Sequence, residues 1–204
     1  MKKLLGSDRD PVHYGIDTKD VDHVGKWGKH ARARNLVALQ LVDKEINCSL
    51  IRGSINAPKL DVGSGNSLMR TMLKHVYGEI LNFSHDLDNK PYPHEKKYKY
   101  IFHFELIEHL LNPLFHLREL RKICRPDGHL FMGTPNDYSL FYKLQHLLSM
   151  KHLTHFHQFN LRELRTLLEL AGWKVVTIKK CHRPDSGILS RFSRNGLFVH
   201  AIPG

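Results

Sequence analysis

The chain has 204 residues, of which 41% are hydrophobic and 25% charged, a composition typical of one folded domain and not of a disordered or fibrous chain. No apolar run approaches the ~20 residues that a membrane-spanning helix needs. The cysteines form no paired motif, which argues against a disulfide framework and a structural zinc site. Together these features predict a cytoplasmic protein. A formal net charge of +11 favours anionic partners, among them RNA, an acidic membrane surface or an anionic substrate.

The N-terminal part shows a change of pattern near residue 27. Residues 1–26 are polar and have no steady period, which predicts a loosely structured arm. Apolar residues then recur at helical spacing up to residue 46. We therefore expect an arm over 1–26 and one domain over 27–204, in which 27–56 form a helix and a loop and 57–204 form the core.

The core alternates between predicted strands and helices. Strands are expected at 57–62, 79–83, 99–104, 129–133, 173–180 and 197–202. Helices are expected at 68–76, 112–124, 138–150 and 161–171. This alternation predicts an α/β three-layer sandwich with a mostly parallel sheet, whose last strand is antiparallel because no helix precedes it.

Local signals mark several ends of these elements. Asn112-Pro113 is typical of a helix N-cap followed by proline at the first helical position. Asn160 followed by Glu163 resembles a capping box, and Gly78 is placed as a glycine that ends a helix. The composition of Arg125-Pro-Asp-Gly128 predicts a turn between a helix and a strand.

A glycine-containing bend follows the first core strand, in the sequence Leu60-Asp-Val-Gly-Ser-Gly-Asn-Ser67. Gly63 and Gly65 allow the backbone to approach a ligand and leave the next helix N-terminus accessible. Leu68 replaces the third glycine of a dinucleotide fingerprint, which disfavours NAD, and the nucleotide P-loop pattern is absent.

Five segments in this order resemble the motifs of class I S-adenosylmethionine-dependent methyltransferases. They are Leu60-Asp-Val-Gly-Ser-Gly, Phe104-Glu-Leu-Ile-Glu-His-Leu-Leu-Asn-Pro113, Leu120-Arg-Lys-Ile-Cys-Arg-Pro-Asp-Gly-His-Leu130, Gly133-Thr-Pro-Asn136, and His155-Phe-His-Gln-Phe159 with the following Leu161–Trp173. The resemblance spans residues 58–202 and implies a Rossmann-like fold, a methyl-transfer activity and S-adenosylmethionine as cofactor.

The resemblance also implies roles for individual residues. Gly63 and Gly65 would line the methionine part of the cofactor, with Asp61 near its ammonium group. A carboxylate after the second strand would bind the ribose hydroxyls, since it accepts two charge-assisted hydrogen bonds; Asp86 is assigned this role, with Ser84 and Asp88 as rivals. The complete set of predicted cofactor-binding residues is Asp61, Gly63, Gly65, Ser84, Asp86, Asp88 and Phe104.

The chain departs from the family pattern after the second strand. The family places a helix and a further strand there, whereas Asp86-Leu-Asp-Asn leads directly to Pro-Tyr-Pro93. The fold is therefore expected to be shortened by one helix–strand unit, with the adenine side open or covered by another segment.

The predicted catalytic residues are Glu105, Glu108 and His109, whose i, i+3, i+4 spacing places them on one face of a helical turn. His109 could act as general base for an oxygen nucleophile. Together with His155 or His157, the three residues also form a candidate Mg²⁺ or Mn²⁺ site, because ubiquinone-pathway O-methyltransferases and small-RNA 2′-O-methyltransferases carry a similar segment. Alternatively, the glutamates cap the following helix and the histidines hold a loop.

These features predict methyl transfer to an oxygen of a small or lipid-linked, anionic substrate. The net charge leaves an RNA methyltransferase open as an alternative, although basic and aromatic residues are not interleaved as in many single-strand binders. The missing helix–strand unit and the altered ribose position leave a third alternative, a non-catalytic binding module with this fold.

Overall fold

A computed structural model describes residues 35, 37–47, 51, 57–63, 68–83, 87–88, 90–136, 156–181 and 195–204. Its strands are β1 (Lys59–Val62), β2 (Leu81–Phe83), β3 (Tyr98–Phe104), β4 (Cys124–Asn136), β5 (Trp173–Cys181) and β6 (Asn195–Pro203). Its labelled helices are α3 (Leu68–Tyr77), the 3-10 helix η4 (Ile107–His109), α4 (Pro113–Ile123) and α6 (Leu161–Leu170), and residues 37–45 form a further helix. The predicted arm over 1–26 and the predicted helix over 138–150 lie outside the described residues.

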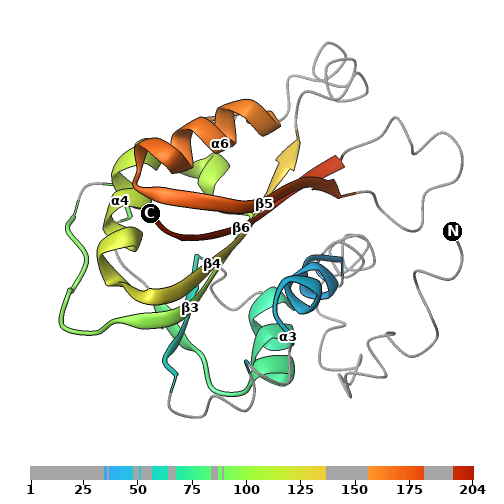
Figure 1. The fold of residues 1–204 in the computed structure, drawn as a ribbon, viewed down its shortest axis with the longest axis vertical. Helices are drawn as coiled ribbons and strands as arrows, with labels where there is room; N and C mark the ends of the chain where they lie inside the picture. Colours follow the sequence, from blue (N-terminus) through green and yellow to red (C-terminus); the bar gives the residue numbers. More distant parts are fainter. Residues whose placement is uncertain are drawn as a thin grey trace, which may run out of the picture.

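The elements form three layers around one sheet (Figure 1). The strand order is β2-β1-β3-β4-β6-β5. β1 is parallel to β2 and β3, and β3 is parallel to β4, whereas β6 runs antiparallel to both β4 and β5. The prediction of a mostly parallel α/β sheet with an antiparallel last strand is confirmed, and the described residues contain the six predicted strands.

Two separate hydrophobic cores lie on the two faces of the sheet. One core contains Leu117 and Leu120 of α4 with Leu164 and Leu168 of α6, and the other contains side chains of α3 with those of the helix over 37–45. In Figure 1, α4 and α6 accordingly lie on one side of the sheet, and α3 on the other. None of the described helices is long and apolar enough to cross a membrane.

The capping signals form as predicted. The side chain of Asn112 accepts a hydrogen bond from the amide of Phe115 at 3.2 Å, and proline follows it at the start of α4. Asn160 and Glu163 form a complete capping box at the start of α6. Gly78 ends α3 with a φ of 80°, a conformation that few residues other than glycine adopt at low cost.

The predicted turn at Arg125-Pro-Asp-Gly128 is wrong. These residues belong to β4, but they bulge out of its ladder, because Cys124 lies opposite Tyr98 and His129 lies opposite Tyr100. Proline and glycine suit such a bulge as well as they suit a turn. Pairing therefore resumes without interrupting the strand.

β1 has a different chemistry on each of its two faces. Leu60 and Val62 belong to the core under α4. Because successive strand residues point to opposite faces, Lys59 and Asp61 face the α3 side, and both are buried, at 6% and 0% exposure. The α3 side of this strand thus carries a cation at its amino end and an anion at its carboxyl end.

The segment before β3 inserts an aromatic side chain where the family places the missing helix–strand unit. Tyr92 is buried and its ring packs against Phe83 at the end of β2, with 4.8 Å between the centroids. Its hydroxyl is hydrogen-bonded to Nδ1 of His116 on α4, and Nε2 of His116 lies 2.8 Å from Nε2 of His103 on β3. A buried chain of three polar side chains therefore joins this segment, α4 and the sheet.

These histidines make the stability of the domain depend on pH. Burial lowers the pKa of His103 from 6.5 to about 4, and burial together with the nearby His103 holds the pKa of His116 well below its ordinary value. Between pH 6.5 and about 4 the unfolded chain binds protons that the folded protein excludes. The free energy of unfolding should therefore fall as pH falls through this window, by ~1.4 kcal/mol per pH unit for each proton.

Urea unfolding at several pH values measures this slope. His103→Gln keeps a polar partner for His116 but removes one titrating group, and it should make the slope shallower. His75→Gln, on the exposed face of α3, is the matched control and should retain the original slope. An unchanged slope in His103→Gln would show that His103 does not titrate as described.

Candidate functional site

The carboxyl ends of the parallel strands form the candidate site. Val62 lies opposite His103, and Phe104 lies opposite Gly133, so β1, β3 and β4 reach this edge together. Open α/β folds bind their ligands at this edge. Of the predicted cofactor residues, Asp61, Gly63 and Phe104 are placed there, whereas Gly65, Ser84 and Asp86 lie outside the described residues.

Asp61 places a negative charge inside the protein at this edge. Its side chain is fully buried, one residue before the end of β1. An ionised carboxylate in such a position is costly unless cationic or hydrogen-bonding groups face it. Asp61 directly precedes the last residue of β1, next to the glycine bend, where the sequence predicted a contact with the ammonium group of the cofactor.

Gly63 is required by two features of the bend. Its φ is 81°, which favours glycine. A Cβ atom at this position would also lie 2.3 Å from Cδ2 of Leu106. The glycine bend and the segment after β3 are thus in direct contact, a contact that the sequence motifs do not show.

Phe104 has a structural role in addition to the predicted one. It is 4% exposed and belongs to the core under α3. A Cβ on Gly133, its partner in β4, would lie 2.8 Å from Cδ1 of its ring. Gly133 therefore makes room for the Phe104 ring beside the carboxyl ends of the strands.

The prediction that Glu105, Glu108 and His109 share one face of a helical turn is wrong. Glu105 precedes the 3-10 helix and has a φ of 54°, in the left-handed region. Its amide donates a 2.8 Å hydrogen bond to the carbonyl of Gly133, which fixes this unusual bend against β4. Only Glu108 and His109 belong to the short helix.

Glu108 is the central polar group of the site. It is 1% exposed, and its Oε2 accepts a 2.9 Å hydrogen bond from the hydroxyl of Thr134 on β4. Its Oε1 lies 3.8 Å from Nε2 of His109, whose side chain is 39% exposed. A buried carboxylate thus stands behind a histidine that is accessible from solvent.

The segment before α6 is hydrogen-bonded to the main chain of Glu108. The amides of Phe156 and His157 donate hydrogen bonds of 2.8 and 3.2 Å to the carbonyl of Glu108. His157 is therefore next to the catalytic candidates through its backbone. Sequence reasoning did not assign a role to Thr134, although its place in the Gly133-Thr-Pro-Asn136 motif was a usable signal.

Asp88, one rival for the ribose role, also makes a contact with the start of α4. Its Oδ1 accepts a 2.8 Å hydrogen bond from the amide of Asn112. Asp88 therefore supports the residue that caps α4. This contact favours Asp86 over Asp88 as the candidate for the ribose.

The predicted metal ligands do not come together in the part of the chain that is described. There, no three His, Cys, Asp or Glu side chains form a group that could hold a metal ion. Glu105 is separated from Glu108 and His109 by the change of backbone conformation, and His157 approaches Glu108 through its main chain. His155 lies outside the described residues.

Comparison with protein families gives one match, in which the model of a methyltransferase domain covers residues 23–178. No curated protein sequence matches the chain.

Solved structures share the fold at low sequence identity. A chain from the complex between the Haloferax volcanii Trm112 methyltransferase activator and a methyltransferase has a TM-score of 0.58 and 13% identity, over 83% of this chain and 96% of that one. An S-adenosylmethionine-dependent methyltransferase from Mesorhizobium loti has a TM-score of 0.53 and 13% identity, over 71% of this chain and 89% of that one. The [4+2]-cyclase SpnF has a TM-score of 0.54 and 12% identity, over 80% of this chain and 82% of that one. Since these include a cyclase, structural likeness alone does not identify the reaction.

Proposed function

Because this chain belongs to the methyltransferase-domain family and is an S-adenosylmethionine-dependent methyltransferase, we propose that it methylates an oxygen of a small or lipid-linked anionic substrate. The observation that carries the proposal is the pair formed by buried Glu108 and accessible His109, beside the glycine bend. An oxygen nucleophile needs a base, and this pair provides one at the edge where the cofactor binds.

The described residues fit the cofactor. Asp61 supplies the buried negative charge for the ammonium group, and Gly63 keeps the bend free of a side chain. Gly65 and Asp86 complete the proposed set, with Asp86 on the ribose hydroxyls. When bound, S-adenosylmethionine supplies an activated methyl group, and the protein contributes mainly alignment and exclusion of water.

His109 would take the proton from the acceptor hydroxyl. Glu108 Oε1 lies 3.8 Å from Nε2 of His109, and the hydroxyl of Thr134 holds the carboxylate in place. Burial of Glu108 strengthens the electrostatic effect of its carboxylate, since fewer water molecules screen the charge. The arrangement is a base supported by a carboxylate, as in other proton-transfer sites.

An assay with hydroxyl compounds and their amine counterparts tests the proposal that the methyl group is transferred to an oxygen. The protein is incubated with S-adenosylmethionine labelled in its methyl group and with hydroxyl compounds and their amine counterparts, each with and without a carboxylate. We expect label on the hydroxyl compounds, most on those that carry the carboxylate. Transfer only to the amines would contradict the proposal.

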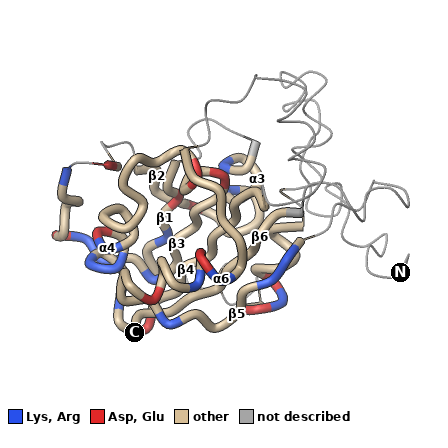
Figure 2. Tube along the Cα trace, turned by 90° about the horizontal axis from the view of Figure 1, so that it is seen from above, with Lys and Arg blue, Asp and Glu red and all other residues tan. Residues whose placement is uncertain are grey.

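Short RNA belongs in the same assay, because of the net charge. Transfer to RNA that falls steeply with added salt would favour the RNA alternative instead. Basic residues beside α4 are interspersed with acidic ones (Figure 2), and Lys99 and Arg125 both pair with Asp127, at 3.1 and 2.9 Å. This pairing favours the small-substrate proposal.

A further inference from the structure

Asn136, the last residue of β4, carries a buried amide side chain. The residue is 6% exposed. Within the part of the chain that the structure describes, its Oδ1 has no hydrogen-bond partner. A buried acceptor without a donor costs free energy, because it has lost its hydrogen bond to water and gained none in the protein. The atom therefore does not stabilise the fold, which indicates a role toward a ligand.

Asn136 points to the same side of β4 as the polar groups of the candidate site. Leu130 and Met132 belong to the core under α4, and alternate residues of a strand share a face. Pairing with β6 is continuous from Leu130 to Asn136, so this alternation is not interrupted. Thr134 and Asn136 therefore both face the α4 side, about 7 Å apart along the strand.

Thr134 connects this position with the proposed base. Its hydroxyl donates a 2.9 Å hydrogen bond to Oε2 of Glu108, and Oε1 of Glu108 lies 3.8 Å from Nε2 of His109. Asn136 follows Thr134 toward the carboxyl end of β4, the end at which open α/β sheets bind their ligands. The amide oxygen thus lies on the ligand side of the carboxylate that accompanies His109.

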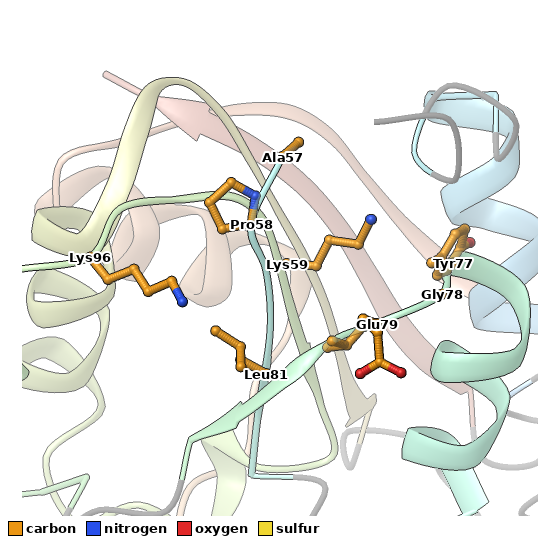
Figure 3. A pocket seen from close by; sticks show the side chains of 9 residues that line it. Ala57, Pro58, Lys59, Tyr77, Gly78, Glu79, Leu81 and Lys96 are labelled. Atoms are coloured by element: carbon orange, nitrogen blue, oxygen red, sulfur yellow. The ribbon is translucent and has the colours of Figure 1, made fainter. Parts of the chain in front are cut away.

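A cavity elsewhere in the sheet is too distant to supply the donor. It has a volume of about 350 Å³ and opens at the amino ends of β1 and β2, where Pro58, Leu81 and Lys96 line it (Figure 3). Asn136 ends β4 at the opposite edge of the sheet. A ligand in this cavity therefore does not reach Asn136, whereas a ligand of the candidate methyl-transfer site does.

We propose that Asn136 binds the methyl acceptor and selects acceptors that carry a second hydrogen-bond donor, a hydroxyl or an amine, in addition to the hydroxyl that is methylated. The amide oxygen of Asn136 accepts a hydrogen bond from the second donor, while His109 takes the proton of the first. A site of this kind rejects analogues without the donor, because its buried acceptor then stays unpaired. The inference rests on the proposed function.

Calorimetry on the full-length protein saturated with S-adenosylhomocysteine tests the second donor. The probes are 3,4-dihydroxybenzoate and 3,5-dihydroxybenzoate. Their controls are 3-hydroxy-4-methoxybenzoate and 3-hydroxy-5-methoxybenzoate, in which the second oxygen cannot donate a hydrogen bond. We expect at least one dihydroxy compound to bind about tenfold more tightly than its methoxy counterpart. Equal affinities within both pairs, or no binding of any of the four compounds, would overturn the proposal.

Asn136→Leu tests whether this preference comes from Asn136. Leucine has a similar volume and no polar atom, so the preference should disappear. The urea midpoint should stay the same or rise, because replacing an unpaired buried polar group by an apolar one is neutral or stabilising. A purely structural asparagine would show the opposite, and a preference that survives in Asn136→Leu would refute the assignment. If Asn136→Leu does not fold, Asn136→Ala removes the same oxygen without adding bulk.

Asn160→Leu is the matched control. Oδ1 of Asn160 accepts hydrogen bonds of 2.9 Å from two amides at the start of α6, so this variant should lower the urea midpoint and keep the preference.

Methyl transfer to the same four compounds separates this inference from the proposed function. Binding that depends on Asn136 without methylation of any hydroxyl would support the binding site and contradict the proposed reaction. Methylation without any preference for the second donor would contradict the role of Asn136 alone.

Discussion

Asp61→Asn should weaken the binding of S-adenosylmethionine by about ten- to hundredfold. The substitution keeps the shape of the side chain but removes a negative charge that is fully buried at the end of β1. A hydrogen bond to a charged group contributes about 1.5–3 kcal/mol, which corresponds to this range of affinity. Isothermal calorimetry with S-adenosylmethionine measures the change directly.

Two aspartates provide controls for this experiment. Asp127 is 51% exposed and pairs with Lys99 at the opposite end of the sheet, so Asp127→Asn should leave the affinity unchanged. Asp88→Asn alters the carboxylate that supports the start of α4 and should also preserve cofactor binding. If Asp61→Asn binds the cofactor as tightly as the unsubstituted protein, Asp61 does not face the ammonium group.

His109→Gln should lower kcat by about 10² to 10⁴ for a hydroxyl acceptor, the usual contribution of a general base. Glutamine can occupy a similar volume, but it cannot accept the proton. Because the proposed role of His109 is toward the acceptor and not toward the cofactor, calorimetry should show unchanged affinity for S-adenosylmethionine. The decisive readout is kcat for the hydroxyl acceptor, measured beside the affinity for the cofactor.

His94→Gln is the matched control for His109. His94 is 44% exposed and lies 3.7 Å from Glu119, away from the glycine bend, so its replacement should preserve kcat. A His109→Gln protein that retains the kcat of the unsubstituted protein would refute the assignment of the base. The methyl-transfer activity of the family would then proceed here by alignment alone.

Elements with local signals were predicted correctly from the sequence. The N-cap at Asn112 and the capping box at Asn160 depend on residues three positions apart, so a short stretch of sequence contains the whole interaction. The mostly parallel sheet with an antiparallel last strand followed from the alternation of strands with helices and from the missing helix before β6. These features need little information about distant residues.

Features that depend on distant contacts could not be predicted in the same way. The left-handed φ of Glu105 is fixed by a hydrogen bond to Gly133, 28 positions along the chain. The proximity of Leu106 to Gly63 has the same character, since it arises from two different strand ends. The composition of residues 125–128 was compatible with either a turn or a bulge, and pairing with β3 decided between them.

The borders of the sheet bear on how the shortened domain behaves at high concentration. Long, flat border strands recruit strands of other molecules and so promote aggregation. In the described sheet, one border is β2, with only three residues, and the other is β5, which carries Lys174, Lys179 and Lys180 and a register irregularity between Val175 and Thr177. A short edge strand on one side of the sheet and a charged, irregular edge strand on the other both disfavour pairing between molecules. The shortened sheet therefore does not expose an aggregation-prone edge strand.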